Sequence, residues 1–343
     1  MTTGFGQAGP VGSDYAERPV LDRILDSIAK NPSIGVVGVS SWDTMLAVRS
    51  MPRPGETAVV ENRIELPGGS AANAAVAAAR LGARVELFSA VGDDPPGVRL
   101  AERLVAAGID ISHTRVGSGE PTCLATRIVS REPPSRTVLE SPGAAPKLGD
   151  RFDIDRLFTR QLVLLDTADP ALRRFLIDLP VHTYPDVKIL VPMAGVVGHP
   201  GRDELDSVVR CDALVGTEQE LLALAGCDSL DEAIRVMQER MHVSNLRTVA
   251  ITRGADGAMA FDARQVFGVA ALDLEVRDTS GAGDAFAGAL AVGLAVRLSL
   301  LDSLVLANCV AGLSTQALGA QAALPSPIGV EIALRRYLDR VRL

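Results

Sequence analysis

Short apolar segments alternate with polar or helix-like stretches along most of the chain. This rhythm is typical of a mostly parallel sheet with helices on both faces. In such sheets ligands bind beyond the carboxyl ends of the strands. The sequence therefore predicts an α/β fold with its site along one sheet edge. The candidate strands are 34–39, 85–90, 162–165, 187–191, 213–215 and 249–252.

Two segments depart from this alternation, and two further strand-like segments follow near the C-terminal end. Residues 44–66 and 122–140 alternate apolar and polar positions around prolines, which predicts short antiparallel strands in a small projecting sheet, a candidate lid. Residues 258–261 follow an Asp-Gly turn and are expected to form a hairpin with the strand at 249–252. Residues 272–276 predict a further strand, which leads into a glycine-rich loop and a long helical region.

The N-terminal region, residues 1–32, reads as an extension to the main domain. Residues 1–16 are rich in Gly, Thr and Ser and predict a mobile tail. Residues 17–30 predict an amphipathic helix, and the remainder, 33–343, is expected to be one α/β domain carrying the two lid segments. The predicted apolar face of the helix consists of Val20, Leu21, Ile24, Leu25 and Ile28.

Composition and charge narrow the functional classes. Hydrophobic residues make up 47% of the 343, enough for a substantial core, and the formal net charge of −8 argues against a nucleic-acid partner. The most apolar region, 290–313, is interrupted by Arg297 and Asp302, so we expect a buried helix pair rather than a membrane span. The four cysteines form no Cys-x-x-Cys pair, and we expect a reduced, cytoplasmic protein.

The most informative segment is the run from Asp278 to Gly288, Asp-Thr-Ser-Gly-Ala-Gly-Asp-Ala-Phe-Ala-Gly. The first amides of a helix have no intrahelical partners and carry partial positive charge, and the glycines let a ligand approach them closely. The backbone around Gly281 and Gly283 therefore predicts an anion hole for a transferring phosphoryl group. Asp284, in the first turn, could accept a proton from an attacking alcohol. Turn and capping roles are the plainer alternative.

Two other glycine-rich nucleotide-binding motifs do not match the sequence. A dinucleotide fingerprint would need Gly where the chain has Phe286, and no lysine follows a glycine as a P-loop requires. A second glycine cluster opens a helix rich in alanine, and Asn73, one turn into it, could bind a polyol. Close helix packing would also explain that cluster. Asp43 follows the first strand, where it could accept from neighbouring hydroxyls or act as a turn residue.

Together these motifs resemble, in content and order, the ribokinase-like carbohydrate kinases of the phosphofructokinase-B superfamily, over about residues 33–328. The Asp278–Asp284 run is the most specific. The motifs, in order, are Gly38 with Asp43, Gly68-Gly69 with Asn73, Thr217-Glu-Gln-Glu220, Thr252-Arg-Gly254 and Asp278-Thr-Ser-Gly-Ala-Gly-Asp284.

The resemblance implies an ATP- and Mg²⁺-dependent kinase, with Asp284 as the base and residues 281–283 as the anion hole. Glu220 would hold Mg²⁺ through water, and Asp278 lies where some members bind a monovalent cation. The lid would also form a homodimer interface. The sugar would bind at Asp43, Gly68, Gly69 and Asn73, and the nucleotide at Thr217, Thr252, Gly254 and Asn308.

This chain departs from the family pattern at three places. Thr217 replaces the usual Asn, which could lower activity or Mg²⁺ affinity. Pro192-Met-Ala-Gly195 stands where many sugar kinases carry polar phosphate contacts. Ala323 replaces an expected hydroxyl residue, which argues against potassium dependence.

The function predicted first is ATP-dependent phosphorylation of a hydroxyl on a sugar or sugar-like molecule. A nucleoside is the alternative acceptor, and Trp42, beside Asp43, is the candidate to stack on its base or on a sugar. Ordinary packing of Trp42 is equally compatible with its position. A non-catalytic sugar or nucleotide sensor is the alternative outside enzymes, because two of the departures affect polar contacts.

Overall fold

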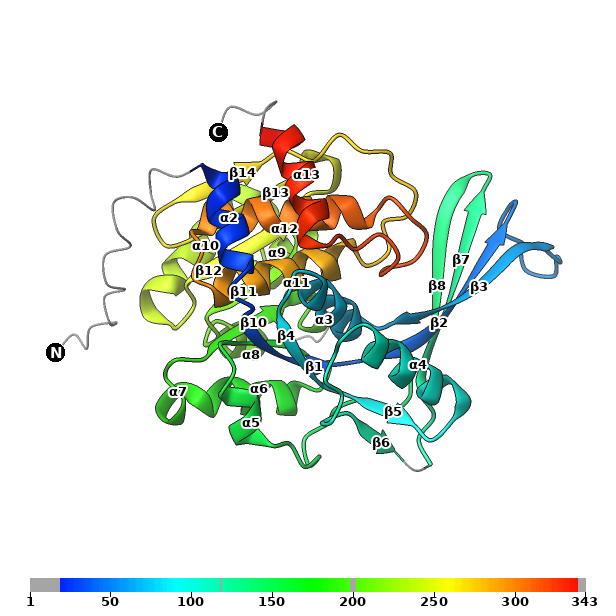
Figure 1. The fold of residues 1–343 in the computed structure, drawn as a ribbon, viewed down its shortest axis with the longest axis horizontal. Coiled ribbons are helices and arrows are strands. Elements are labelled where there is room, and N and C mark those ends of the chain that lie inside the picture. Colours follow the sequence, from blue (N-terminus) through cyan, green and yellow to red (C-terminus); the bar gives the residue numbers. More distant parts are fainter. Residues whose placement is uncertain (1–18, 118, 198–201, 339–343) are drawn as a thin grey trace.

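An eight-stranded sheet forms the centre of the structure, a computed structural model that describes residues 19–117, 119–197 and 202–338 (Figure 1). The order is β14-β13-β12-β11-β10-β9-β1-β4. The strands from β12 to β4 run parallel, and β13 and β14 add an antiparallel edge. The strands are β1 (Ser33–Gly38), β4 (Arg84–Phe88), β9 (Leu162–Asp166), β10 (Lys188–Pro192), β11 (Ala213–Thr217), β12 (Thr248–Thr252), β13 (Ala258–Phe261) and β14 (Val266–Val269).

The predicted α/β class and the strands at the core of the sheet are confirmed. The predicted strand at 272–276 is wrong, because β14 takes the edge position beside β13 instead. Leu272 and Leu274 lie against Gly312 of a neighbouring helix, so their apolar character serves helix packing. The predicted tail over 1–16 lies outside the described residues.

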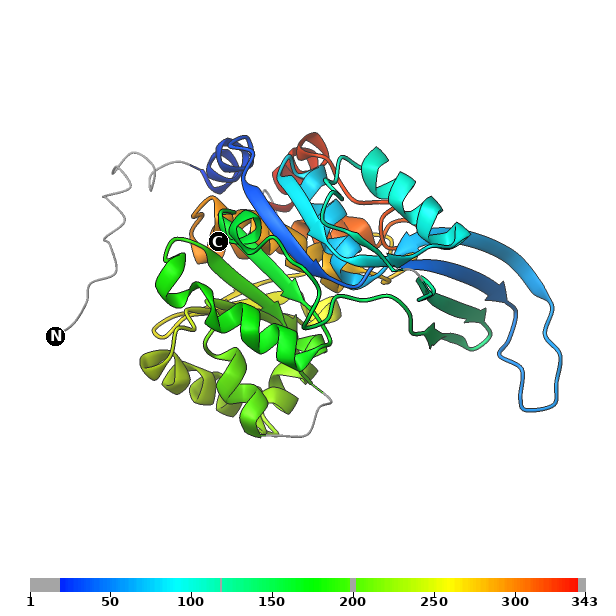
Figure 2. The ribbon, with the colours of Figure 1, turned by 90° about the horizontal axis from the view of Figure 1, so that it is seen from below.

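Helices cover both faces of the sheet, and side chains from alternate strand positions enter two separate cores (Figure 2). In β9, for example, Leu164 belongs to one core and Leu165 to the other. The helices of the first core are α2 (Val20–Ile28), α3 (Ser70–Arg80), α4 (Pro95–Ala106), α11 (Ala282–Ala295), α12 (Leu300–Ser314) and α13 (Pro327–Leu338). Those beside the second are α5 (Ile154–Phe158), α6 (Pro170–Asp178), α7 (Pro180–Thr183), α8 (Arg202–Val208), α9 (Glu218–Ala225) and α10 (Leu230–Val243).

Helix α2 packs on the main domain with the predicted apolar face. Leu21, Ile24 and Ile28 are buried. Arg23 of the same helix donates to both oxygens of the fully buried Asp302 in α12, at 2.8 and 2.7 Å. The bidentate pair satisfies a carboxylate that would otherwise be costly to bury.

The apolar region 290–313 forms parts of α11 and α12, which confirms the predicted buried helix pair. Arg297, in the short connection, adopts a left-handed conformation with φ of 60°. Among the described residues, no helix combines the length and apolar character that a bilayer crossing requires.

A four-stranded sheet in the order β3-β2-β7-β8 projects from the main body (Figures 1 and 2). Its two hairpins are antiparallel, as the lid segments predict, and they join through a parallel β2–β7 pair that the pattern did not indicate. We call this sheet the lid. Its strands are β2 (Ser41–Val48), β3 (Val60–Gly68), β7 (Cys123–Arg131) and β8 (Pro134–Ser141), and the short pair β5 (Ala90–Gly92) and β6 (Arg115–Gly117) lies beside it.

Candidate functional site

Asp284 lies in the first turn of α11, partly exposed to solvent. Its Oδ2 accepts a hydrogen bond of 2.8 Å from Nδ2 of Asn73 in α3. The two helices approach closely because their facing residues are small: a Cβ on Gly288 would come within 2.4 Å of the Ala74 carbonyl oxygen. Nε2 of Gln321 donates to Oδ1 of Asn73 at 2.9 Å and so fixes the orientation of the amide.

The pKa of Asp284 is raised to about 7. Loss of solvent is the main cause, and the nearby carboxylates Asp166 and Asp43 add to it. The hydrogen bond from Asn73 and the charge of Arg127 oppose the rise. A carboxyl group with this pKa can exchange a proton near neutral pH.

In the glycine-rich loop at the start of α11, Gly281 is packed against the protein and Gly283 is open to free space. Gly281 has φ of 73°, and a Cβ there would come within 2.3 Å of Cβ of Ala320. A Cβ on Gly283 would meet no atom within 4 Å, so its backbone faces free space. Asp278 holds the loop, since its carboxylate accepts from the Ser280 amide at 2.9 Å and the Gly319 amide at 2.8 Å.

A pocket of about 160 Å³ connects Asp284 to the carboxyl ends of β9, β10, β11 and β12. Five predicted site residues line it: Gly283, Asp284, Thr217, Glu220 and Thr252. The other lining residues are mostly small or apolar. Pro192 and Ala194, from the segment that departs from the family pattern, are among them.

Asp166, at the end of β9, also lines this pocket and was not predicted. The hydroxyl of Ser70, at the start of α3, donates to its Oδ2. Burial and the charge of Glu220 raise the pKa of Asp166. Its position directly after an apolar strand was the available signal, because such positions meet at the carboxyl edge of the sheet.

Thr217 and Glu220 form a capping box at the start of α9. The Thr217 hydroxyl accepts from the Glu220 amide at 3.2 Å, and Glu220 Oε2 accepts from the Thr217 amide at 2.8 Å. Threonine at 217 therefore preserves the helix start. The reciprocal bonds hold the Glu220 carboxylate at the pocket.

Asp43 lies in β2 beside the second glycine cluster. It accepts from the Ser41 hydroxyl at 2.6 Å and from Nε of Arg127 in β7 at 2.9 Å. A Cβ on Gly68 would lie 2.4 Å from the Asp43 carboxylate, so only glycine leaves room for it. Gly69 has φ of 89°, a conformation that glycine adopts readily, and it is the N-cap of α3.

The lid contacts the glycine-rich loop directly. Nη1 of Arg136 in β8 donates to the Ser280 hydroxyl at 3.0 Å. By strand register, Arg136 lies on the same face of the lid as Arg127. The lid therefore presents arginines towards Asp43 and towards the start of α11.

The other predicted site residues do not line this pocket, namely Asp43, Gly68, Gly69, Asn73, Gly254, Asp278, Gly281, Ala282 and Asn308. Asn308 is buried in α12, where its Nδ2 donates to the Ala270 carbonyl at 2.8 Å. Gly254 follows β12 with φ of 60° but does not line the pocket. Trp42 is 7% exposed, which favours the packing interpretation. It donates to Glu65 at 3.2 Å, and the Arg99 guanidinium lies 5.3 Å from its ring centroid.

Comparison with known proteins assigns the chain to a family. The family model for pfkB family carbohydrate kinases matches residues 32–327. The chain is 28% identical to a ribokinase of Lactococcus lactis, over 88% of this chain and 97% of that protein. It is 29% identical to a 2-dehydro-3-deoxygluconokinase of Thermoproteus tenax, over 90% of this chain and 98% of that one.

Solved structures show the same fold. A putative ribokinase from Agrobacterium tumefaciens superposes with a TM-score of 0.80 at 23% identity, covering 91% of this chain and all of that one. A ribokinase from Arabidopsis thaliana, complexed with ribose and ATP, gives a TM-score of 0.76 at 24% identity, covering 89% of this chain and 99% of that one. With the family model matched over most of its length, the chain belongs to the pfkB family of carbohydrate kinases.

Proposed function

We propose that this carbohydrate kinase transfers the terminal phosphoryl group of ATP to a hydroxyl of a sugar or sugar acid, with Asp284 as the base. The placement of Asp284 beside the open backbone of Gly283, in one pocket, carries the proposal. The names of the relatives, ribokinase and 2-dehydro-3-deoxygluconokinase, support this acceptor class.

In the proposed reaction the acceptor oxygen attacks phosphorus while its proton passes to the Asp284 carboxylate. The bond from phosphorus to the leaving oxygen of ADP breaks, and the backbone of residues 281–283 stabilises the transferring group. Phosphoryl transfer depends mainly on positioning and charge stabilisation. Asn73 keeps the reacting oxygen of Asp284 oriented through its 2.8 Å hydrogen bond.

The acceptor would bind between the lid and α3, at Asp43, Gly68, Gly69 and Asn73. Beside their bonds within the protein, the carboxylate of Asp43 keeps lone pairs and the amide of Asn73 keeps one N–H, which a polyol could use. The arginines of the lid lie on the same side. Closure of the lid over the acceptor would exclude water and suppress ATP hydrolysis.

The nucleotide would lie beyond the other side of the pocket, near Thr217, Thr252 and Gly254. We retain Asn308 only as a distant contributor, because its amide is engaged with Ala270. Asp278 is assigned a role in holding the loop, which its two backbone hydrogen bonds support. A monovalent cation at Asp278 stays a prediction.

The pocket residues fit Mg²⁺. Asp166 and Glu220 are hard oxygen ligands, and burial with mutual repulsion raises the pKa of Asp166, a condition that a cation would relieve. The described residues contain no cluster of three or more potential protein ligands, which suits an ion that keeps waters and phosphate oxygens. When bound, the ion would offset phosphate charge.

A coupled assay of ADP release, run over sugars, sugar acids, sugar phosphates and nucleosides, tests the proposal. We expect turnover with one sugar or sugar acid and none with Asp284→Asn under the same conditions. Turnover only with nucleosides would support the alternative acceptor. ATP binding without ADP release for every acceptor would support the sensor.

A further inference from the structure

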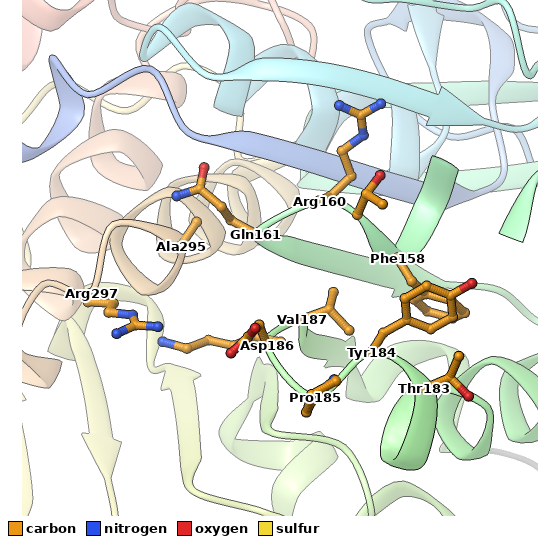
Figure 3. Close-up of a pocket in the computed structure, with 12 residues that line it drawn as sticks. Phe158, Arg160, Gln161, Thr183, Tyr184, Pro185, Asp186, Val187, Ala295 and Arg297 are labelled. Carbon is orange, nitrogen blue, oxygen red and sulfur yellow. The ribbon is translucent and has the colours of Figure 1, made fainter. Parts of the chain in front are cut away.

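A second and larger pocket lies at the opposite end of the sheet (Figure 3). Its volume is about 440 Å³, within the range of small-molecule sites. It is bounded by the residues before β9 and β10 and by the C-terminal end of α11. The glycine-rich loop and Asp284 are at the other end of the same helix, about 20 Å away at 1.5 Å per residue.

Arg297 at the rim of this pocket has an unfavourable backbone conformation. It occupies the left-handed position that ends α11, where its amide donates to the Leu294 carbonyl at 3.1 Å and the Leu298 amide to the Gly293 carbonyl at 2.9 Å. Glycine normally takes this position, because a side chain there costs energy. The Arg297 side chain is exposed and has no hydrogen-bond or ion-pair partner within the described ranges. Strained residues of this kind concentrate at functional sites.

Lys188, the first residue of β10, brings a second positive charge to the pocket. Its Nζ donates to the Leu294 carbonyl at 2.9 Å, which leaves two N–H groups for other acceptors. Burial lowers the pKa of Lys188, the charge of Arg297 lowers it further, and the charge of Asp212 opposes the fall. Lys188 and Arg297 line the same pocket, and an anion between them would offset their repulsion.

Gln161 supplies an oriented amide at the same wall. Its Oε1 accepts from the Ser33 amide at 2.8 Å and from the Ser33 hydroxyl at 3.4 Å. These bonds fix the side chain and leave its Nε2 with no protein acceptor among the residues described. A fixed amide donor beside two cations is suited to an oxyanion.

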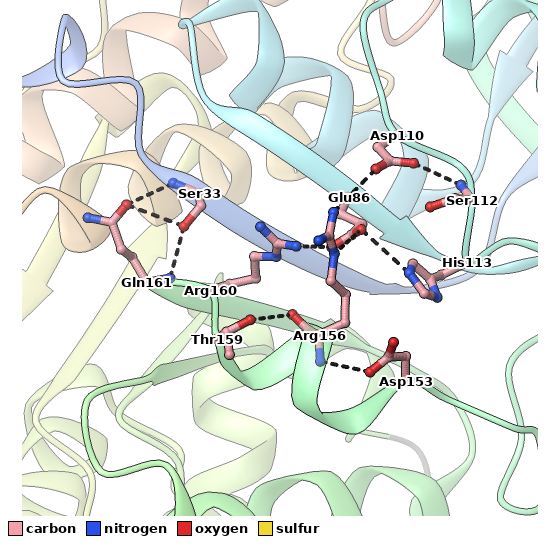
Figure 4. A network of polar contacts seen from close by, with 10 residues as sticks. All are labelled: Ser33, Glu86, Asp110, Ser112, His113, Asp153, Arg156, Thr159, Arg160 and Gln161. Carbon is pink, nitrogen blue, oxygen red and sulfur yellow. Dashed lines mark hydrogen bonds and ion pairs between the residues drawn. The ribbon is translucent and has the colours of Figure 1, made fainter.

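Arg160, also on the lining, is already neutralised. Its Nη2 lies 2.6 Å from Oε2 of the buried Glu86, which also binds Arg156 at 2.9 Å (Figure 4). This network explains Arg160 without a ligand. Within the described ranges neither Arg297 nor Lys188 forms an ion pair, with Asp186 of the lining or with another carboxylate, although the charge of the buried Asp212 carboxylate acts on Lys188.

An aromatic wall completes the pocket. The rings of Phe158 and Tyr184 are 5.4 Å apart at 37° (Figure 3). The Tyr184 hydroxyl donates to Asp155. Such a wall can cover the carbon skeleton of a ligand whose charged group lies elsewhere.

We propose that this pocket is a second ligand site, which binds the phosphate group of a small phosphorylated metabolite between Arg297, Lys188 and Gln161. The aromatic wall contacts the organic part. The site is separate from the pocket of Asp284 and does not depend on the proposed function.

Calorimetric titration at constant ionic strength tests the site, with inorganic phosphate and ribose 5-phosphate as probes. Wild type is expected to bind saturably, and Arg297→Asn to bind at least tenfold more weakly, since asparagine tolerates the left-handed conformation. Arg264→Asn, in the turn after β13, removes another exposed arginine and is the matched control. Its affinity should equal that of wild type.

Arg297→Gly, which removes the guanidinium and relieves the strain, provides a second variant if the first is unstable. Tighter binding of ribose 5-phosphate than of inorganic phosphate identifies a phosphorylated metabolite as the ligand. Equal affinities would refute the role of the aromatic wall. Absence of saturable binding, or an unchanged affinity in both Arg297 variants, would overturn the site, because the bound phosphate would then lie elsewhere.

Discussion

At the residue scale, Asp284 combines a loss of solvation with the repulsion of neighbouring carboxylates, and both destabilise its charged form. Its side chain is only partly exposed, it has lost most of its solvation and it lies near other carboxylates, yet it accepts one side-chain hydrogen bond, from Asn73. A folded protein that keeps such a group stores an unfavourable charge at that position. The proposed role as base uses that charge.

Replacing Asp284 with Asn should lower turnover by about 10²–10⁴, the usual contribution of a general base. The amide has nearly the same shape, so the fold and ATP affinity should be unchanged. Stopped-time ADP assays and ATP titration measure the two quantities. Turnover near the wild-type value would remove Asp284 from the mechanism.

The raised pKa predicts how activity depends on pH. A base must be ionised, so kcat/KM should fall as pH decreases through about 7, the pKa of Asp284 in the free protein. A profile from pH 5 to 9, with coupling enzymes in excess, measures it. A flat profile across this range would contradict the assignment.

The same shift predicts a stability effect of opposite sign to the activity effect. The folded-state pKa lies above the ordinary value, so folding favours the protonated form, and stability is lost as pH rises from about 4 towards 7. Asp284→Asn carries no charge at any pH. Its melting temperature should therefore exceed that of wild type at pH 8, and by less at pH 5. Equal differences at both pH values would show that the carboxylate is not desolvated.

At the scale of elements, the start of α11 has two glycines with different environments. Gly281 is left-handed and packed against Ala320, whereas Gly283 is helical and faces open space. The sequence predicted both as one anion hole. Only Gly281 depends on the 316–321 loop, which is distant in sequence, because Ala320 packs against it.

Gly283→Ala should therefore lower activity, whereas Gly281→Ala should lower stability. Alanine at 283 meets nothing in the protein and favours the helix, so stability should be kept or rise by up to about 1 kcal/mol. Its methyl group would obstruct phosphoryl binding, and we expect activity to fall about 10²-fold, the scale of one lost donor. Alanine at 281 should lose about 1–2 kcal/mol or more of stability, from the left-handed strain and the clash. Denaturant unfolding measures the stability of both variants, and the ADP assay measures their activity. Full activity of Gly283→Ala would exclude an anion hole at Gly283.

Local pattern was sufficient for most elements because each strand and helix carries its own periodicity. The buried strands, the α11–α12 pair and the two lid hairpins follow from it. The edge of the main sheet was misassigned because residues 272–276 are apolar for packing on α12, while β14 is largely exposed. Asp166 and the Arg136–Ser280 contact join segments far apart in the chain, and no local pattern encodes such pairs.

At the scale of the whole molecule, the lid has two different faces. One face carries Asp43, Arg127 and Arg136 towards the site. By register, the other face carries Leu124, Ile128 and Leu139, with Leu124 38% and Leu139 56% exposed. Exposed apolar residues gathered on one face mark an interaction surface.

We propose that a second copy of the chain covers this outer face of the lid, giving a homodimer. Light scattering after size exclusion should then report about twice the 35.9 kDa of one chain. Leu139→Glu places a charge at the most exposed leucine of this face, in the edge strand β8, and should yield monomers, since burying an unpaired carboxylate is costly. Val243→Glu, at the 82% exposed end of α10, is the matched control and should stay dimeric. Since we propose that the lid covers the acceptor, we also expect the Leu139→Glu monomer to show a raised KM for the acceptor. A wild-type monomer, or a dimer that survives Leu139→Glu, would assign the outer face of the lid to solvent.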